Sequence, residues 1–240
     1  MTWDEVISLA KGFSRSEGGV EYHGLDIQWP WRYLPFAYGL PFTDTEGKVD
    51  LANPGWAEVL RLYKRAYDEQ NNYANNDFIV QHFLKTRDVA MYAGNASAII
   101  EDHDNKFGEF NWDMVTFPKY SGRELIWPAN PFMFAPTKSS KHRELAFELT
   151  LAFQSEPMLE TDRAKEQEMK NRLQSANKNI EAIYAMKPVK YVASKYDATA
   201  NTTLQKKMAE LQIGKDINTV LREWKEETEK QVESQKVGSK

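Results

Sequence analysis

The order in which strand-like and helical segments follow each other is the strongest constraint on the fold. In the first half of the chain, segments with strand character at 20–28 and 89–92 alternate with a helical apolar pattern at 54–72. After Ser140, apolar residues recur only at helical spacing, so we expect no further strand. Strands interleaved with helices early, and helices alone late, predict an α/β sheet layer wrapped by extra helices.

Local signals predict several further elements. Thr2 and Glu5 form the pattern of a capping box, which indicates a helix that starts at residue 2. A helix is also expected at 94–100. Short strands are expected at 112–117, where apolar residues alternate, and at 132–135, where an apolar run stands between two prolines.

Composition excludes several functional classes. The 240 residues include 31 Lys and Arg against 35 Asp and Glu, and the net charge of -4 has the wrong sign for nucleic-acid binding. Mean hydropathy is -0.66 and no run of about 18 apolar residues occurs, so no membrane span is expected. The sequence has no cysteine, which excludes disulfides and thiolate chemistry. We expect a folded globular chain without a nucleic-acid partner.

Motifs that carry enzymatic chemistry are missing from the sequence. It has neither a glycine-rich phosphate loop nor a Gly-x-Ser-x-Gly nucleophile elbow, and its four histidines are widely separated. The acidic segment 101–105 does not fit a calcium loop, because Phe107 stands where a turn glycine is needed. A carboxylate pair for glycoside hydrolysis leaves no spacing signal. We therefore predict no cofactor, no metal site and no enzymatic activity.

An aromatic block that two prolines interrupt, at 29–38, is the densest feature of the sequence. Its spacing follows neither the helical nor the strand period, so part of it is expected outside regular structure. Indole and phenol rings offer flat faces on which a sugar can stack while polar side chains bind its hydroxyls. We predict that Trp29 and Trp31 line a cleft and that Phe36 and Tyr38 belong to the core. The alternative for each ring is a place in the core.

Seven short segments stand in a characteristic order along the chain. They are Thr2–Glu5, Gly24–Leu25, Val89–Tyr92 with Gly94, Ala135–Lys141, Leu145–Glu148, Ser155–Pro157 and Ile217–Gln231. In this order and spacing they resemble the second half of bacterial extracellular solute-binding proteins of the carbohydrate ABC-importer class. The resemblance implies the type II fold of periplasmic binding proteins, in which two α/β lobes close around a solute. This chain would be the second lobe with additional C-terminal helices.

The same resemblance implies a division of the chain. Residues 1–135 would form the core of an α/β lobe, 136–187 a helical segment that packs partly on an N-terminal lobe missing here, and 188–240 helices that return to the first unit. A signal peptide and any lipid anchor would precede this part of such a protein. It would lie in the periplasm or on the extracellular face of the membrane, with the membrane permease of an ABC importer as its partner.

The implied function is to bind a carbohydrate or similar small polar solute in the cleft between lobes. The side chains expected to contact this solute are Trp29, Trp31, Tyr33, Asn95, Trp127, Asn130 and Tyr191. The rings would stack on the solute, and the two asparagines would bind its hydroxyls. Two alternatives use the same aromatic surface: a carbohydrate-processing enzyme and a protein-interaction module.

Overall fold

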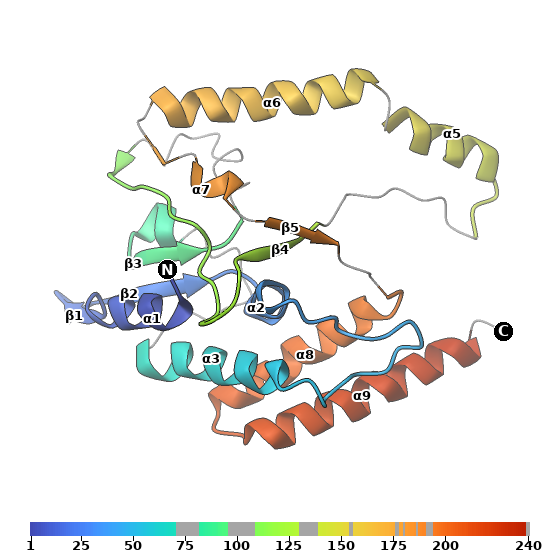
Figure 1. Ribbon diagram of the computed structural model, residues 1–240, viewed down its shortest axis with the longest axis horizontal. Helices are drawn as coiled ribbons and strands as arrows, with labels where there is room; N and C mark the ends of the chain where they lie inside the picture. Colours follow the sequence, from blue (N-terminus) through green and yellow to red (C-terminus); the bar gives the residue numbers. More distant parts are fainter. Residues whose placement is uncertain are drawn as a thin grey trace.

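The elements of the fold come from a computed structural model of the chain. The structure describes residues 1–70, 82–95, 109–129, 139–153, 156–175, 178–179, 181–185, 187–190 and 194–238. Within these ranges the helices are α1 (Trp3–Lys11), α2 (Pro30–Tyr38), α3 (Gly55–Gln70), α5 (Arg143–Phe153), α6 (Glu156–Ser175), α7 (Glu181–Tyr184), α8 (Asp197–Gln212) and α9 (Ile217–Gly238), with a π-helical turn η1 (His82–Thr86). The strands are β1 (Arg15–Glu17), β2 (Val20–Ile27), β3 (Val89–Ala93), β4 (Ile126–Ala129) and β5 (Lys187–Lys190). Sheets covered by helices confirm the expected α/β class (Figure 1).

Helix α1 begins where the capping-box pattern predicts. The Thr2 hydroxyl accepts a hydrogen bond from the Glu5 amide at 3.3 Å, and the Glu5 carboxylate accepts one from the Thr2 amide at 2.6 Å. These reciprocal bonds satisfy two of the amides that a helix start leaves without partners. The helix then buries Trp3, Val6 and Ile7 and packs against β2.

The first sheet has the strand order β1-β2-β3. Its hairpin turns at Gly18 and Gly19, whose φ angles of 60° and 82° suit a two-residue hairpin turn. The sequence did not predict β1, because its three residues are all exposed and show no apolar alternation. Strands β2 and β3 are parallel, with Ile27 opposite Ala93 near the end of both. Their carboxyl ends therefore lie together at one edge of the sheet.

Most of the aromatic block forms helix α2, and Trp29 stays outside it as the residue before the first helical position. Part of the block therefore lies outside regular structure as expected, but both prolines stand inside the helix. Pro30 occupies the first helical position, where an amide would have no partner within the helix. Pro35 has no amide to donate to the Trp31 carbonyl one turn earlier. That carbonyl instead accepts a hydrogen bond from the Asn201 side chain of α8 at 3.5 Å. Gly39 ends the helix with a φ of 84°.

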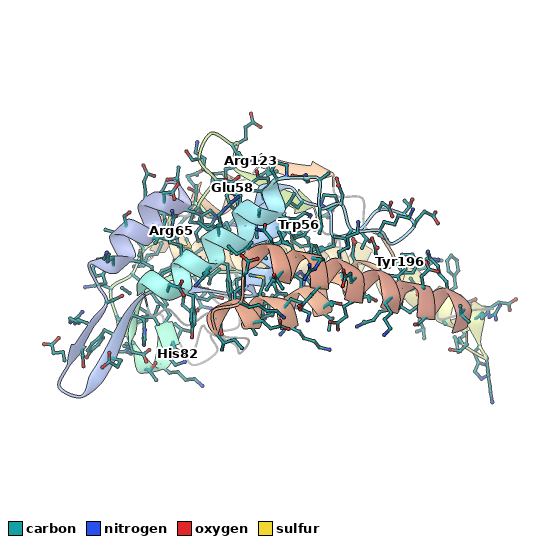
Figure 2. All side chains as sticks on the ribbon, turned by 90° about the horizontal axis from the view of Figure 1, so that it is seen from below. Trp56, Glu58, Arg65, His82, Arg123 and Tyr196 are labelled. Atoms are coloured by element: carbon teal, nitrogen blue, oxygen red, sulfur yellow. The ribbon has the colours of Figure 1, made fainter. Side chains whose placement is uncertain are left out.

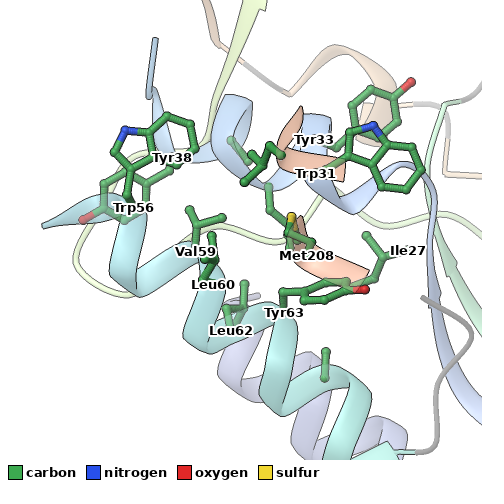
Figure 3. Close-up of a cluster of buried hydrophobic side chains, with 14 of the residues drawn as sticks. Ile27, Trp31, Tyr33, Tyr38, Trp56, Val59, Leu60, Leu62, Tyr63 and Met208 are labelled. Atoms are coloured by element: carbon green, nitrogen blue, oxygen red, sulfur yellow. The ribbon is translucent and has the colours of Figure 1, made fainter. Parts of the chain in front are cut away.

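A hydrophobic core lies where α2, α3, α8 and α9 meet. Figure 2 shows α3 with Trp56 beside α9, and Figure 3 shows buried side chains of α2, α3 and α8. Trp56 of α3 and Trp224 of α9 pack with ring centroids 4.4 Å apart, and both are almost completely buried. The Trp224 indole N–H donates to the Ala200 carbonyl at 2.9 Å, which joins α9 to α8. Phe36 and Tyr38 are buried in the same cluster, as the sequence predicted.

A second, two-stranded sheet pairs β4 with β5 in parallel. We expected no strand after Ser140, and β5 shows that expectation to be wrong. Its four residues have no sequence pattern of their own and become a strand by pairing with β4. Helices α5 and α6 lie beyond this sheet, on the side away from α8 and α9 (Figure 1).

The strand expected at 112–117 is also wrong, because these residues have no regular structure. Their polar groups bind outside any sheet: the Asp113 carboxylate accepts a hydrogen bond from the Asn179 amide at 2.8 Å. Lys178 donates to the Trp112 carbonyl. The acidic segment, the strand expected at 132–135 and most of the helix expected at 94–100 lie outside the described residues.

Candidate functional site

The candidate site is the edge where β2 and β3 end. The Gln28 amide donates to the Ala93 carbonyl at 2.9 Å, which extends the parallel pairing by one residue. The Gln28 side-chain carbonyl then accepts a hydrogen bond from the Asn95 amide at 2.8 Å. One glutamine therefore ties the residues after β3 to the residues after β2. In open α/β sheets, ligands commonly bind outside the carboxyl ends of the parallel strands.

Gly94 permits this close approach. A Cβ atom at this position would overlap the Tyr92 hydroxyl and would lie 2.8 Å from the Gln28 side-chain carbonyl oxygen. Any other residue would therefore require the Tyr92 and Gln28 side chains to move.

Trp29 connects β2 to α2 in a strained conformation. Its φ of 43° and ψ of 59° are in the left-handed region, which non-glycine residues rarely adopt. Its carbonyl accepts the amides of Arg32 and Tyr33, both at 2.9 Å, so the strained residue also starts the helix. Such strain costs about 1–3 kcal/mol and persists only where the surroundings enforce it.

The side chains at this edge form a contiguous polar and aromatic group. The Trp29 and Tyr33 rings lie 5.6 Å apart, and the Asn95 side chain hydrogen-bonds to the Tyr33 phenol. Burial raises the pKa of Tyr33, while the nearby Arg32 charge and the Asn95 hydrogen bond oppose that rise. The phenol therefore stays neutral at physiological pH and can donate a hydrogen bond. Figure 3 shows its hydroxyl pointing away from the buried cluster.

Trp29, Tyr33 and Asn95 lie at this edge, whereas Trp31 only neighbours it along the chain, and these predicted contact residues differ in exposure. Trp29 is partly exposed and Asn95 is exposed. Trp31 and Tyr33 are buried in the core cluster, with 7% and 5% of their surface exposed. Most of the Trp31 ring therefore packs against protein, and Tyr33 reaches the edge only through its hydroxyl end.

The structure does not place the other three predicted contact residues at this edge. The backbone of Trp127 lies in β4 opposite Pro188 of β5, and α2 packs against β4. Asn130 and Tyr191 lie outside the described residues.

Sequence reasoning missed Gln28 and Arg32. Gln28 follows a predicted strand directly, and the residue after a parallel strand is a usual place for ligand-binding or positioning groups. Arg32 stands within the aromatic block, but its position beside Trp29 depends on helix α2, which the two prolines made unexpected.

Two open surface grooves lie away from this edge. One of about 820 Å³ runs along α9 and is lined by charged and amide side chains that include Lys207, Glu223 and Gln231. The other, of about 260 Å³, lies beside α3. Neither contains a predicted contact residue. In the described ranges, no group of three histidine or acidic side chains is placed to hold a metal ion.

One buried carboxyl group lies on β2 itself. Asp26 is completely buried, and neither carboxylate oxygen accepts a hydrogen bond of ordinary geometry from any residue that the structure describes. Burial raises its pKa to about 8; the Ile27 amide partly offsets this, and the charge of Asp88 adds to it. The carboxyl group is therefore largely neutral at pH 7.

The fold is that of a periplasmic binding protein. The chain superposes on the maltose/maltodextrin-binding domain MalE from Bdellovibrio bacteriovorus bound to maltotriose, with a TM-score of 0.65 and 16% identity, over 96% of this chain and 66% of that one. It also superposes on M. tuberculosis UspC, with a TM-score of 0.52 and 17% identity, over 85% of this chain and 57% of that one. The chain thus spans less than two thirds of the length of each. No protein-family model and no curated protein sequence matches it.

The helices in the described ranges include none with the length and apolar character needed to cross a bilayer.

Proposed function

We propose that the chain is part of a solute-binding protein of an ABC importer and that it binds a carbohydrate or a similar small polar solute. The proposal includes a location in the periplasm or on the extracellular face, and a membrane permease as the partner. The fold supports the binding role, and one of the structural neighbours, MalE, holds a bound maltotriose.

The observation that carries the proposal is the group of side chains at the β2–β3 edge. A partly exposed indole, a neutral phenol and an exposed amide lie together where such folds hold ligands. The Trp29 ring offers a stacking face, and the Tyr33 hydroxyl and Asn95 amide offer hydrogen bonds to sugar hydroxyls. Trp31 would support this group of side chains from the core. Trp127, with the two predicted residues outside the described ranges, would extend it.

Calorimetry and thermal shift with mono- and oligosaccharides test the proposal. A saccharide at 100 times its Kd should stabilise the chain by about 2.7 kcal/mol. Trp29→Ala and Asn95→Ala should each reduce that stabilisation. Tyr22→Ala removes a partly exposed ring from the other end of β2 and should leave it unchanged. Loss of binding in the Tyr22 variant as well, or in none of the three, would contradict this site.

The same panel separates the proposal from an enzymatic role. A binding protein returns the oligosaccharides unchanged after prolonged incubation, whereas a carbohydrate-processing enzyme releases shorter products. Chromatography of the incubated panel distinguishes the two, and any turnover by the purified chain would favour the enzyme.

We also propose that α5 packs against a further lobe, as the expected division of the chain implies. Its side chains Leu145, Phe147, Leu149 and Leu151 are each more than half exposed. Apolar residues on several sides of one helix indicate a surface that is normally covered. In the chain alone, hydrogen exchange of α5 amides should be much faster than that of α3 amides. Equal protection in a monomer would contradict the proposal.

A further inference from the structure

We propose that the solute bound at the β2–β3 edge carries an anionic group, a carboxylate or a phosphate, and that Arg32 binds it. The inference rests on the proposed function, because it names the chemical class of the solute for the same site. It starts from a cationic side chain at the edge that forms no ion pair with any described residue.

Arg32 lies in the first turn of α2, beside the residues that form the edge. Its guanidinium carbon is 5.9 Å from the centre of the Trp29 ring and 5.7 Å from that of Phe36. Its positive charge also lowers the pKa of the neighbouring Tyr33 phenol, against the effect of burial. The side chain is partly exposed.

No acidic group neutralises this charge in the part of the chain that the structure describes. Arg32 forms no ion pair and no side-chain hydrogen bond there, and the first turn of α2 has no acidic residue. Lys207 and Lys215, by contrast, are both paired with Glu223. An arginine held by ring faces keeps its N–H groups for another partner, because the cation–π contact does not use them.

An anion is the partner that fits these observations best. The planar guanidinium can form two parallel hydrogen bonds to a carboxylate or a phosphate, and the positive end of the helix dipole adds to the attraction. A neutral sugar would stack on Trp29 but would leave the charge without a counterion. The solute class that satisfies both features is a saccharide with a uronate or phosphate substituent.

Matched neutral and anionic probes test the inference. Calorimetry would compare glucose with glucuronate and glucose 6-phosphate, and galactose with galacturonate. We expect the anionic member to bind about 10- to 100-fold more tightly, as for a hydrogen bond to a charged group. The carboxylate and phosphate probes show which anion is preferred, and the advantage should shrink at high salt.

Variants of the chain assign the preference to Arg32. Arg32→Gln should bring the anionic probe to the affinity of its neutral partner, and Arg32→Lys should keep part of the preference. Arg222→Gln removes an exposed arginine on α9 and should change nothing. Circular dichroism confirms that each variant is folded. Because Arg32 also contacts two rings, the preference ratio, and not the absolute affinity, is the deciding measurement.

The outcomes separate this inference from the proposed function. If neutral saccharides bind as tightly as their anionic partners, or if Arg32→Gln keeps the preference, the inference is refuted and the binding function stands. If no saccharide of either kind binds, the proposed function fails together with it.

Discussion

Replacing Asp26 by asparagine should change how stability depends on pH. The carboxyl group is completely buried, and within the described ranges its oxygens accept no hydrogen bond of ordinary geometry. Burial raises its pKa to about 8 from the usual 3.8. Between these two values the folded chain holds a proton that the unfolded chain has lost. Rising pH therefore favours unfolding across this range, and the stability present below pH 3.8 is lost as the pH approaches 8.

The size of the effect follows from the pKa difference. Each pH unit within the range lowers the free energy of unfolding by about 1.4 kcal/mol. At pH 7 the loss reaches about 4 kcal/mol, a large part of the roughly 5–15 kcal/mol that holds a typical domain folded. An asparagine side chain at this position would have nearly the same shape and no proton to lose. Any cost of burying its amide is independent of pH, so it shifts the whole stability curve without changing its slope.

Urea denaturation, followed by tryptophan fluorescence at pH 5, 6, 7 and 8, measures the difference. The Asp26→Asn variant should gain about 1.4 kcal/mol relative to the parent chain with each pH unit. Glu21→Gln, at an exposed position of the same strand, should show no such gain. Parallel pH profiles for the parent and the Asp26 variant would refute the reasoning.

Two packing predictions can be checked in the same denaturation assay. Gly24→Ala should destabilise the chain by more than about 2 kcal/mol, because its Cβ would overlap the Ala10 backbone. Gly12→Ala is the control, since its Cβ meets an atom only at 3.4 Å and should be tolerated. Equal stability of the two variants would contradict the Gly24 contact. Trp224→Phe should lower the free energy of unfolding by about 1–3 kcal/mol, because it loses the hydrogen bond to the Ala200 carbonyl and part of the packing against Trp56 of α3. An unchanged urea midpoint would show that these contacts do not stabilise the chain.

Local sequence signals predicted the elements that their own residues stabilise. The capping box located α1, and apolar spacing located α3 and β3, since each pattern acts within a few residues. Helix α2 was missed because the group that compensates for Pro35 is Asn201, far away in the sequence. Strand β5 was missed because pairing with β4 creates it. A pattern within a few residues cannot predict a partner that lies far away in the sequence.

In the candidate site too, local sequence predicted some residues and missed those whose position depends on distant parts of the chain. Residue chemistry predicted Trp29 and Asn95 as contacts, because an indole and an amide suit sugar binding, and the structure places both at the β2–β3 edge. It did not identify Gln28, because the role of this side chain depends on β3 ending beside β2. The ring of Trp31 was predicted to line a cleft, and its 7% exposure follows from the helix that turns it toward the core.

The β2–β3 edge is held in place by the protein before any solute arrives. Gln28 fixes the Asn95 backbone, Gly94 leaves room for the Tyr92 and Gln28 side chains, and the surroundings keep Trp29 in a conformation it would not adopt alone. A solute would therefore lose little affinity to ordering of these groups. A single wall nevertheless covers only part of a ligand, whereas small-molecule sites commonly bury most of it. The affinity of this chain alone should thus be limited by the solute surface left uncovered and not by flexibility of the edge. A second protein surface that covers the solute should strengthen binding without rearranging the β2–β3 edge.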